Sequence, residues 1–290
     1  PRHPVSSIFS GVSSIAIRPI YWHDWPYILR HRRQAESLDN IQMLTRGFPL
    51  SWYSVLSSFS PAENTFTGAF VDEDGDRKAV GQVHQSSQIS SAQIQFVLAG
   101  EAQQDELTIL LEGLCKEAGG WGAKQVIAEL APDSLIYPAI RQAGFRVFGK
   151  QRLYRFQEGI DSTSGVEGHW RIWNSNDIQA MRVLYQALVP PLIQPVEPLT
   201  RLEMLGLVFY DEGGELQAFA DLVYGPIGIW VLPFIHPQST VEFSALLGRM
   251  IQDLPERNRR PVYVVARSYQ PWVETARDFR EGERGLEEAL

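Results

Sequence analysis

The sequence contains one cysteine, no long apolar run and no excess of basic residues. A lone cysteine cannot form an intramolecular disulfide, which suits a reducing compartment. Cys115 follows Leu114 in a helical pattern, so we expect a buried structural thiol. The longest apolar run, Pro226 to Ile235, is too short to cross a bilayer. We therefore expect a cytoplasmic protein without a membrane-spanning segment.

Basic charge is scarce as well, because the formal net charge is −8 at pH 7. Nucleic acid and anionic membranes require a basic surface, so neither is an expected partner. The densest basic cluster runs from Arg30 to Arg33, and we interpret it as a solvated helix face. The six histidines are scattered without the paired spacing of metal ligands, and no metal site is predicted.

The most informative feature of the sequence is an internal repeat. The segment FVDEDGDRKAV (Phe70 to Val80) reads as two strands joined by an acidic turn, and FYDEGGELQAF (Phe209 to Phe219) repeats it 139 residues later. A chain of 290 residues has room for two domains of ordinary size. An upstream pair recurs at an offset of 153: Arg18 and Asp24 match Arg171 and Asp177.

The repeat divides the chain into a first domain over residues 1–158, a linker over 159–168 and a second domain over 169–290. The linker is rich in Gly, Ser and acidic residues and has no apolar period. The first half ends in RVFGKQRLYRF, which alternates as a closing strand should. The second half ends in REGERGLEEAL, which does not alternate, so we expect this half to be incomplete.

Both halves show the same order of elements: a strand, helices that in the first half include LDNIQMLTRGF, a hairpin, a strand, a helix, a strand and a short helix. Helices interleaved with paired strands predict an α/β (α+β) fold, with a mixed, mostly antiparallel sheet flanked by helices in each half. In the first half, the elements expected after the hairpin are a strand at Ala92–Leu98, a helix at Asp105–Ala118, a strand at Gln125–Leu130 and a short helix at Pro138–Ala143. In the second half they are a strand at Ile227–Leu232, a helix at Thr240–Leu254, a strand at Val262–Ala266 and a short helix at Pro271–Arg277.

This order of elements, with AIRQAGFRVFGKQRLYRF closing the first half, resembles the GNAT superfamily of acetyl-CoA-dependent N-acetyltransferases. The resemblance covers nearly the whole chain as a tandem pair and includes an Ala-Gly-Phe stop at Gly144. It implies acyl transfer from acetyl-CoA to an amine. The implied partners are acetyl-CoA and a small-molecule amine or another ligand, and a homodimer is compatible with it.

The motif by which the family holds CoA can be aligned with the first half. Members follow a central strand with Val-x-Pro-x-x-Arg/Gln-Gly-x-Gly-x-Gly/Ala-x-x-Leu-Leu, whose backbone N–H groups hold the pyrophosphate. Here Val97 and Leu110-Leu111 match its two ends, but Gln103, Asp105 and Leu107 replace the glycine-type positions. Acidic residues at a helix start stabilise its dipole and repel a pyrophosphate. In the first half this segment is therefore predicted to be a capped helix start that does not bind CoA.

The second half is also degenerate, but its loop is less hostile to phosphate. Val231 and Pro233 match the motif, while Pro237 lacks an N–H and Ser239 with Glu242 predicts a capping box. If this half binds CoA, the resemblance assigns the binding residues to this loop: Leu232, Pro233, His236, Gln238, Ser239 and Thr240.

Candidate catalytic residues are few. The family's usual tyrosine position, four residues before the glycine of the Gly-Phe pair, holds Ile140. Tyr137 and Tyr269 lie about one turn earlier and could replace it as a general acid, although a structural tyrosine fits as well. Glu129 could serve as a general base toward an amine.

Two hypotheses follow from these residues. The chain is an acyl-CoA-dependent N-acyltransferase whose chemistry lies in the second half, or it is a non-catalytic GNAT-like scaffold that binds a ligand or a protein.

Overall fold

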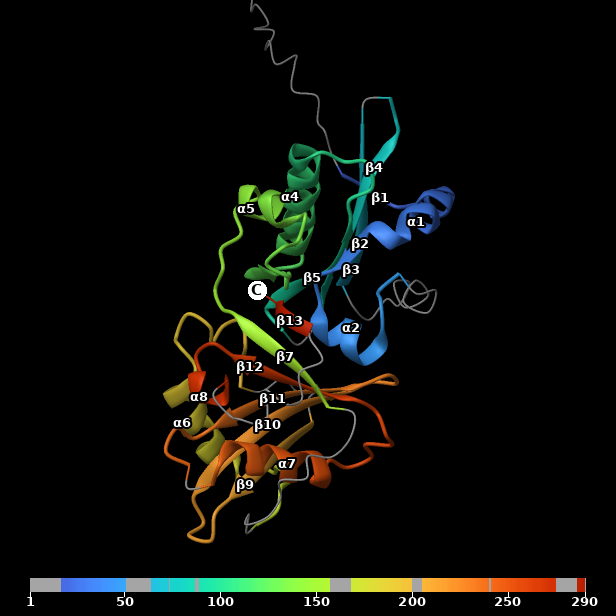
Figure 1. Cartoon of the computed structure of the whole chain (residues 1–290). Helices are drawn as coiled ribbons and strands as arrows, with labels where there is room; N and C mark the ends of the chain where they lie inside the picture. Colours follow the sequence, from blue (N-terminus) through green and yellow to red (C-terminus); the bar gives the residue numbers. More distant parts are fainter. Residues whose placement is uncertain are drawn as a thin grey trace, which may run out of the picture.

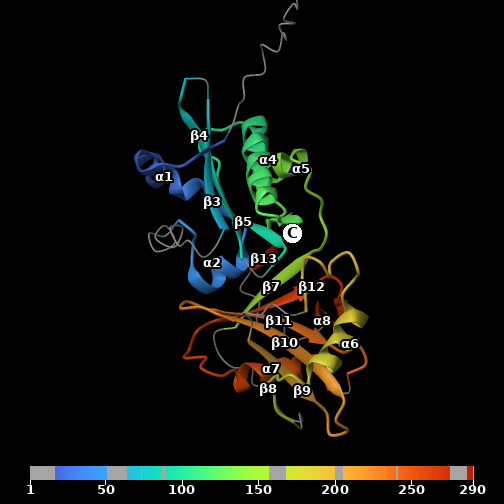
Figure 2. The same ribbon diagram turned by 180° about the vertical axis from the view of Figure 1, so that it is seen from behind.

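The computed structural model of the chain describes residues 17–50, 64–72, 74–86, 89–156, 168–199, 205–239, 241–274 and 286–289. These residues form two mixed sheets flanked by helices, with the first sheet above the second in Figure 1 and in the reverse view of Figure 2. The predicted fold class and the duplicated order of elements are confirmed.

The first sheet has the strand order β1-β3-β4-β5-β2, and β6 also pairs with β5. The pairs are antiparallel except β5–β6, which is parallel. The hairpin predicted at Phe70–Val80 is present, and Gly75 in its turn has a φ of 87° that favours glycine. The strands are β1 (Arg18–Pro19), β2 (Ala35–Ser37), β3 (Asn64–Val71), β4 (Arg77–Gln85), β5 (Ser91–Leu98) and β6 (Gln125–Ile127).

Helix α4 (Gln104–Gly120) packs on one face of this sheet, and α1 (Trp25–His31) packs on the other. Apolar residues three and four positions apart give α4 a buried face that includes Leu110 and Leu114. Each fully buried leucine contributes about 1.5–3 kcal/mol. The short helix α5 (Tyr137–Gln142) ends as predicted before Gly144, which has a φ of 94°.

The second sheet has the order β13-β7-β12-β11-β10-β9-β8. Every residue of β11 is buried, as expected for a central strand covered on both faces. The helices that cover those faces are α6 (Ile178–Leu188) and α7 (Phe243–Asp253). The strands are β7 (Gln151–Phe156), β8 (Arg171–Ile172), β9 (Leu205–Tyr210), β10 (Leu216–Tyr224), β11 (Ile229–Ile235), β12 (Val262–Arg267) and β13 (Leu286–Ala289), and α8 spans Pro271–Glu274.

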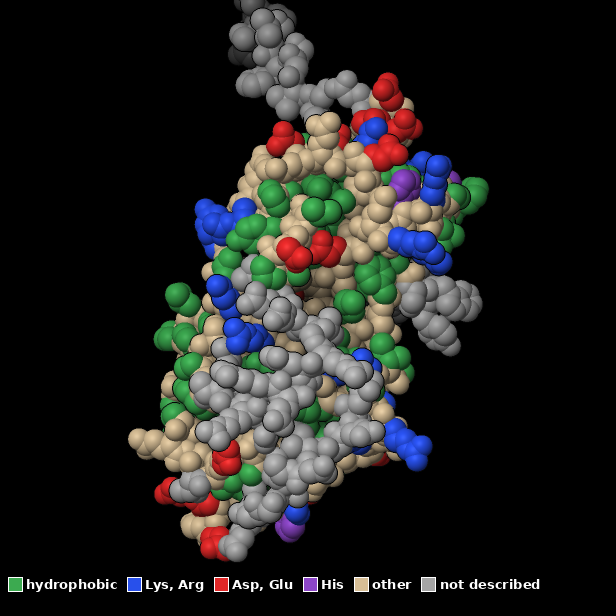
Figure 3. Space-filling view, viewed as in Figure 1, with side chains coloured by type: hydrophobic (Ala, Val, Ile, Leu, Met, Phe, Trp, Pro, Cys, Tyr) green, Lys and Arg blue, Asp and Glu red, His purple; other side chains and the backbone are tan. Residues whose placement is uncertain are grey.

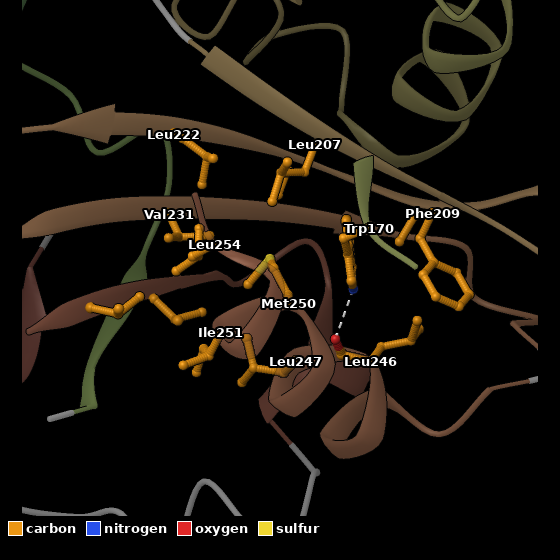
Figure 4. Close-up of a cluster of buried hydrophobic side chains, with 14 of the residues drawn as sticks. Trp170, Leu207, Phe209, Leu222, Val231, Leu246, Leu247, Met250, Ile251 and Leu254 are labelled. Atoms are coloured by element: carbon orange, nitrogen blue, oxygen red, sulfur yellow. Dashed lines mark hydrogen bonds between the residues drawn. The ribbon is translucent and has the colours of Figure 1, made fainter. Parts of the chain in front are cut away.

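The core between the second sheet and α7 contains Trp170, whose indole N–H donates to the carbonyl oxygen of Leu246 at 2.9 Å (Figure 4). Leu207 and Phe209 face this core, whereas Val208 between them faces α6. This two-residue alternation is the side-chain period of a strand.

Strand β7 corrects one prediction from the sequence. The segment after Phe148 does form the expected strand, but it closes the second sheet and not the first. β7 pairs antiparallel with β12 from Val262↔Phe156 to Arg267↔Gln151, and β13 pairs with its other edge. β7 belongs to the predicted first domain, which ends at residue 158, yet it is hydrogen-bonded in the second sheet. The domain boundary at 158 stays a prediction.

A second connection between the halves is made by α2 (Asn40–Arg46), which packs against the turn between β10 and β11. The backbone N–H of Ile227 donates to the carbonyl oxygen of Thr45 at 3.1 Å. A Cβ at Gly225 would lie 2.0 Å from that same oxygen, so the close approach requires glycine.

Two further predictions were wrong in detail, and one strand was not predicted. The unpredicted strand is β2 at residues 35–37, next to the predicted helical segment, and it pairs with β5. Helix α7 begins at Phe243 and not at Thr240, which lies outside the described residues. The final segment, expected not to form a strand, contains β13.

No helix in the described ranges combines the length and apolar character that a membrane span requires.

Candidate functional site

The junction between β5 and α4 is the capped helix start that the sequence predicted. The backbone N–H of Gln103 donates to the Glu106 carboxylate at 2.7 Å, which closes the first turn. Asp105 accepts from the Gln142 side chain at 2.9 Å. Both carboxylates that would repel a phosphate are thus held at the helix N-terminus.

The Tyr27 side chain covers the backbone bend at Gly100, just before this junction. Gly100, with a φ of 54°, lies under the Tyr27 side chain, because a Cβ there would be 2.0 Å from the tyrosine oxygen. The Tyr27 hydroxyl donates to the carbonyl oxygen of Lys78 at 2.9 Å. Burial raises the pKa of Tyr27, while a hydrogen bond from the Glu101 backbone acts in the opposite direction.

Open α/β sheets hold ligands in crevices at the carboxyl ends of their strands. In the first half such a crevice begins where β5 and β6 stop pairing, because β6 contacts only residues 91–93 of β5. Strand β2 pairs with residues 96–98 on that same edge of β5. The crevice between β5 and β6 is therefore occupied by a strand of the chain itself.

Leu38 completes the filling of this first crevice. Its N–H donates to the carbonyl oxygen of Gln95 at 2.9 Å, and its own carbonyl oxygen accepts from the Glu129 N–H at 2.9 Å. The Leu38 side chain is fully buried among the residues that pack against α4. Residues 35–38 thus bridge β5 to the segment that follows β6.

The second half has the same crevice between β11 and β12, filled by a different group. These strands pair only from Ile229↔Val262 to Val231↔Val264, so the β12-facing edge of β11 beyond Val231 has no strand partner there. The Gln270 side chain donates to the carbonyl oxygen of Pro233 at 2.9 Å and accepts from the Ile235 N–H at 3.1 Å. Gln270 is 1% exposed, so its amide closes the crevice from inside.

In the predicted phosphate-binding turn of the second half, backbone N–H groups donate to acceptors within the turn itself. The N–H of Gln238 donates to Nδ1 of His236 at 3.1 Å, and the N–H of Ser239 donates to the carbonyl oxygen of His236 at 2.9 Å. The N–H of Val241 donates to Oγ of Ser239 at 3.2 Å. The predicted capping box between Ser239 and Glu242 is therefore wrong, because Glu242 is itself the N-cap of α7.

Leu232 and Pro233 precede this turn, within β11. Leu232 is buried against α6, and Pro233 lies opposite Ala220 in the β10 pairing. The predicted residue Thr240 lies outside the described residues. The backbone N–H groups of the candidates Gln238 and Ser239, and that of Val241 after them, already have acceptors within the chain.

The catalytic candidates are distributed over two cavities. Tyr137 lines an apolar cavity of about 50 Å³ beside β6 and α5. Glu129 and Tyr269 line another, of about 10 Å³, between the halves, which has room for about one water molecule. No residue of the 236–239 turn lines either cavity. The structure thus brings together one predicted base and one predicted acid, but not the predicted cofactor turn.

Both groups at the cavity between the halves have structural partners. The Glu129 carboxylate accepts from the Asn40 N–H at 2.9 Å and so caps α2. The Tyr269 hydroxyl donates to Glu197 at 3.0 Å. Burial, followed by the charge of Glu197, raises the pKa of Tyr269 far above its ordinary value.

Sequence reasoning missed the residues that hold this region together. Arg267 pairs with Glu197 at 2.6 Å and also donates to the Gln151 side chain on β7. Glu197 is 4% exposed, which makes the pair a buried ion pair. These residues are far apart in the sequence, so no spacing could have indicated their contact. Gln270 gave no signal either.

Within the described part of the chain, no group of three or more His, Cys, Asp or Glu side chains could hold a metal ion. Cys115 is partly buried, and burial raises the pKa of its thiol to about 11. A thiol with so high a pKa is a poor nucleophile at neutral pH, in agreement with the structural role predicted for it.

No family model and no curated protein matches the chain. Solved structures do match its fold. A GCN5-related N-acetyltransferase from Sphaerobacter thermophilus aligns with a TM-score of 0.56 and 14% identity over 97% of this chain and 95% of its own. One from Kribbella flavida aligns with a TM-score of 0.51 and 13% identity over 82% of this chain and 91% of its own.

At sequence identities this low, the alignments show a shared fold only, and the role of a residue in one protein cannot be assigned to the aligned residue in the other. The first alignment extends over both halves of the chain, and the described parts of the two halves share one order of strands and helices apart from β2 and α2 of the first half. The chain therefore has the fold of the GCN5-related N-acetyltransferases, the GNAT superfamily, in two consecutive copies.

Proposed function

We propose that this protein is a non-catalytic GNAT-fold scaffold in which neither half uses acetyl-CoA. The observation that carries the proposal is that each half fills its own crevice. Residues 35–38 pair with β5 in the first half, and the Gln270 amide bonds β11 in the second. A ligand would have to displace hydrogen-bonded, buried groups before it could bind, and that displacement opposes binding.

The two strand–helix junctions support the same proposal. In the first, Glu106 occupies the N-terminus of α4 with negative charge. In the second, the N–H groups of Gln238, Ser239 and Val241 are already bonded within the turn. Binding of a pyrophosphate at either place would first break these bonds.

The catalytic candidates also favour a structural role. The Tyr269 hydroxyl donates a hydrogen bond to a buried carboxylate and has a raised pKa, so it is a poor proton donor to a leaving group at neutral pH. Glu129 caps a helix. To act as the base and the acid of an N-acyltransferase on a small-molecule amine, Glu129 and Tyr269 would have to leave these partners. A cytoplasmic location remains part of this proposal.

The test is an acetyl-transfer assay that follows release of free CoA thiol in the presence of a panel of primary amines. We expect the wild-type protein and the blocked variant Ser239→Glu with Thr240→Glu to give the same background rate. Amine-dependent release of CoA by the wild type that disappears in the blocked variant would contradict the proposal and support an N-acyltransferase active in the second half.

A further inference from the structure

The helical segment that follows β1 exposes a tryptophan where the second half has serine, Ser175. It consists of the 3₁₀ turn Trp22–Asp24, α1 and the 3₁₀ turn Arg32–Gln34. Trp22 is 84% exposed and Leu29 is 55% exposed. In Figure 3, Lys/Arg, His and hydrophobic side chains gather over α1. Exposed residues of this segment also include His23, Arg32 and Gln34, and we use the name α1 surface for five of the exposed residues: Trp22, Pro26, Leu29, Arg30 and Arg33.

Within α1, Pro26 lies three positions before Leu29 and four before Arg30, so these three residues share one helix face. Trp22 and Arg33 lie in the 3₁₀ turns that directly precede and follow α1. Ile28, between them in sequence, is buried against the first sheet. The α1 surface is therefore one patch that faces away from the core.

Because the fold is repeated, the turn after β1 can be compared with the equivalent turn after β8, and features common to both are those that the fold requires. In both halves an arginine on the first strand holds an aspartate in a two-bonded ion pair: Arg18 with Asp24, and Arg171 with Asp177. The same aspartate also accepts a backbone N–H three residues before it. The two turns are thus built by the same bonds.

The exposed side chains of the equivalent segments differ in type at three of the five positions, whereas Leu29 and Arg30 match Arg182 and Val183, which are likewise an exposed arginine beside an exposed apolar residue. At the offset of 153, Trp22 matches Ser175, Pro26 matches Gln179, and Arg33 matches Gln186. Ser175, Gln179 and Gln186 are exposed, as a solvated face should be. The turn and helix therefore form without an exposed tryptophan, and Trp22 is not required by the fold.

Tyr21, which is also exposed, has a partner within the fold, because the centroid of its ring lies 5.4 Å from the guanidinium carbon of Arg18. In the second half, Tyr210 takes that position over Arg171, at 5.2 Å. The role of Tyr21 is thus explained within the fold.

The segment that carries the α1 surface has a formal charge opposite in sign to that of the whole chain. Over residues 18–34 there are four arginines and one aspartate, so the formal charge is 4 − 1 = +3, whereas the whole chain has −8. The aspartate, Asp24, is fully buried and paired with Arg18 and Arg77. The exposed charge of this segment is therefore positive.

We propose that the α1 surface binds an acidic segment of a partner protein, with Trp22 and Leu29 as apolar anchors and Arg30 and Arg33 as partners of its carboxylates. Tryptophan and arginine are the residue types that contribute most at protein interfaces. Arginine pairs with carboxylates through two parallel hydrogen bonds. The proposal concerns a surface other than the crevices and does not depend on whether acetyl-CoA binds.

The test is to pan random twelve-residue peptides displayed on phage against the immobilised full chain. Fluorescein-labelled copies of the enriched peptides are then titrated in solution. We expect the enriched sequences to be rich in Asp and Glu with at least one Leu or aromatic residue. Their affinity should fall as the ionic strength is raised from about 50 mM to about 300 mM, because salt screens exposed charges.

Two variants locate the binding. Trp22→Ser, which installs the residue of the second half, should weaken binding by about tenfold or more. Arg30→Glu with Arg33→Glu should weaken it at least as much by reversing the charge. Arg182→Glu, on the matching helix face of the second half, should leave it unchanged. Thermal unfolding confirms that each variant is folded, and the two variants test the surface independently.

Three results would overturn the proposal: no enrichment of acidic sequences, equal binding by wild type and both variants, or binding at this surface of another class of partner. For the last, the probes are a single-stranded oligo-dT of about 20 nucleotides and phosphatidylcholine vesicles containing phosphatidylserine. Loss of oligo-dT or vesicle binding in Trp22→Ser, without peptide binding, would assign the surface to nucleic acid or membrane.

Discussion

The side-chain amide of Gln270 bonds the backbone of Ile235 as a neighbouring strand would, accepting its N–H at 3.1 Å. The amide nitrogen donates to Pro233 two residues earlier, at 2.9 Å. One side chain thus satisfies a donor and an acceptor on the β11 edge at the point where β12 diverges. A buried backbone group without a partner is costly, which explains why a polar residue is buried here.

Replacing Gln270 with leucine should therefore destabilise the protein. Leucine keeps most of the volume but leaves the Ile235 N–H and the Pro233 carbonyl oxygen buried without partners. We expect the free energy of unfolding to fall by about 2–4 kcal/mol, measured by urea denaturation. The control is Gln238→Leu at an exposed position, which should change it by no more than about 0.5 kcal/mol. Equal effects of the two substitutions would count against the role given to Gln270.

Leu38 fills the crevice of the first half, and truncating its side chain should also lower the free energy of unfolding. Its side chain is fully buried, so Leu38→Ala should lower the free energy of unfolding by about 2–5 kcal/mol through lost burial and a cavity. Leu135→Ala is the matched control, because Leu135 is 93% exposed. A loss below about 1 kcal/mol for Leu38→Ala would mean that residues 35–38 are not held in the crevice.

Stability should depend on pH through Asp177. Hydrogen bonds from Arg171 at 2.7 and 2.6 Å are the largest cause that lowers the pKa of this carboxyl to about 2. The folded pKa lies below the unfolded value of about 3.9, so the stabilisation is present above about pH 4 and is lost as pH falls toward 2.

The measurement is the urea midpoint at a series of pH values between about 2 and 6. Asp177→Asn should be less stable than wild type at pH 6, and its midpoint should fall less steeply below pH 4. Asp74→Asn, at an exposed turn position, should follow the wild-type curve. Parallel curves for Asp177→Asn and wild type would show that this ion pair does not contribute.

The buried pair between Arg267 and Glu197 joins β12 to the segment after α6 at the boundary between the halves. Arg267→Met would leave the Glu197 carboxylate buried with only its neutral partner, the Tyr269 hydroxyl. We expect a loss of about 3–5 kcal/mol, which Glu197→Gln in the same chain should partly restore. A double-mutant cycle by urea denaturation measures the coupling, and additive effects would rule out a functioning pair.

The sequence predicted the features of this fold that are local. The acidic hairpins at Phe70–Val80 and Phe209–Phe219 and the capped start of α4 were readable, because turn residues and helix caps act over a few positions. The recurrence of Arg18 and Asp24 as Arg171 and Asp177 corresponds to the same ion pair in both halves.

Long-range partners were not readable. Alternation identified β7 as a strand, but a strand's period does not say which sheet it joins, and β7 joins the second. Residues 35–37 pair with β5 some sixty residues away, and Gln270 reaches the strand that ends at Ile235. The filling of both crevices depends on these contacts, so the sequence indicated the strand–helix junctions but not the crevices beside them or the groups that fill them.

The measurement that tests this account most directly is a calorimetric titration of acetyl-CoA into the wild-type protein at about millimolar ligand, with thermal unfolding in parallel. We predict no binding heat and no rise in the unfolding temperature, because both crevices are occupied by the chain itself. Binding to the folded state at a hundredfold excess over Kd would stabilise it by about 2.7 kcal/mol. Such a shift, with micromolar binding heat abolished in Ser239→Glu with Thr240→Glu, would contradict the account and place a working cofactor site in the second half.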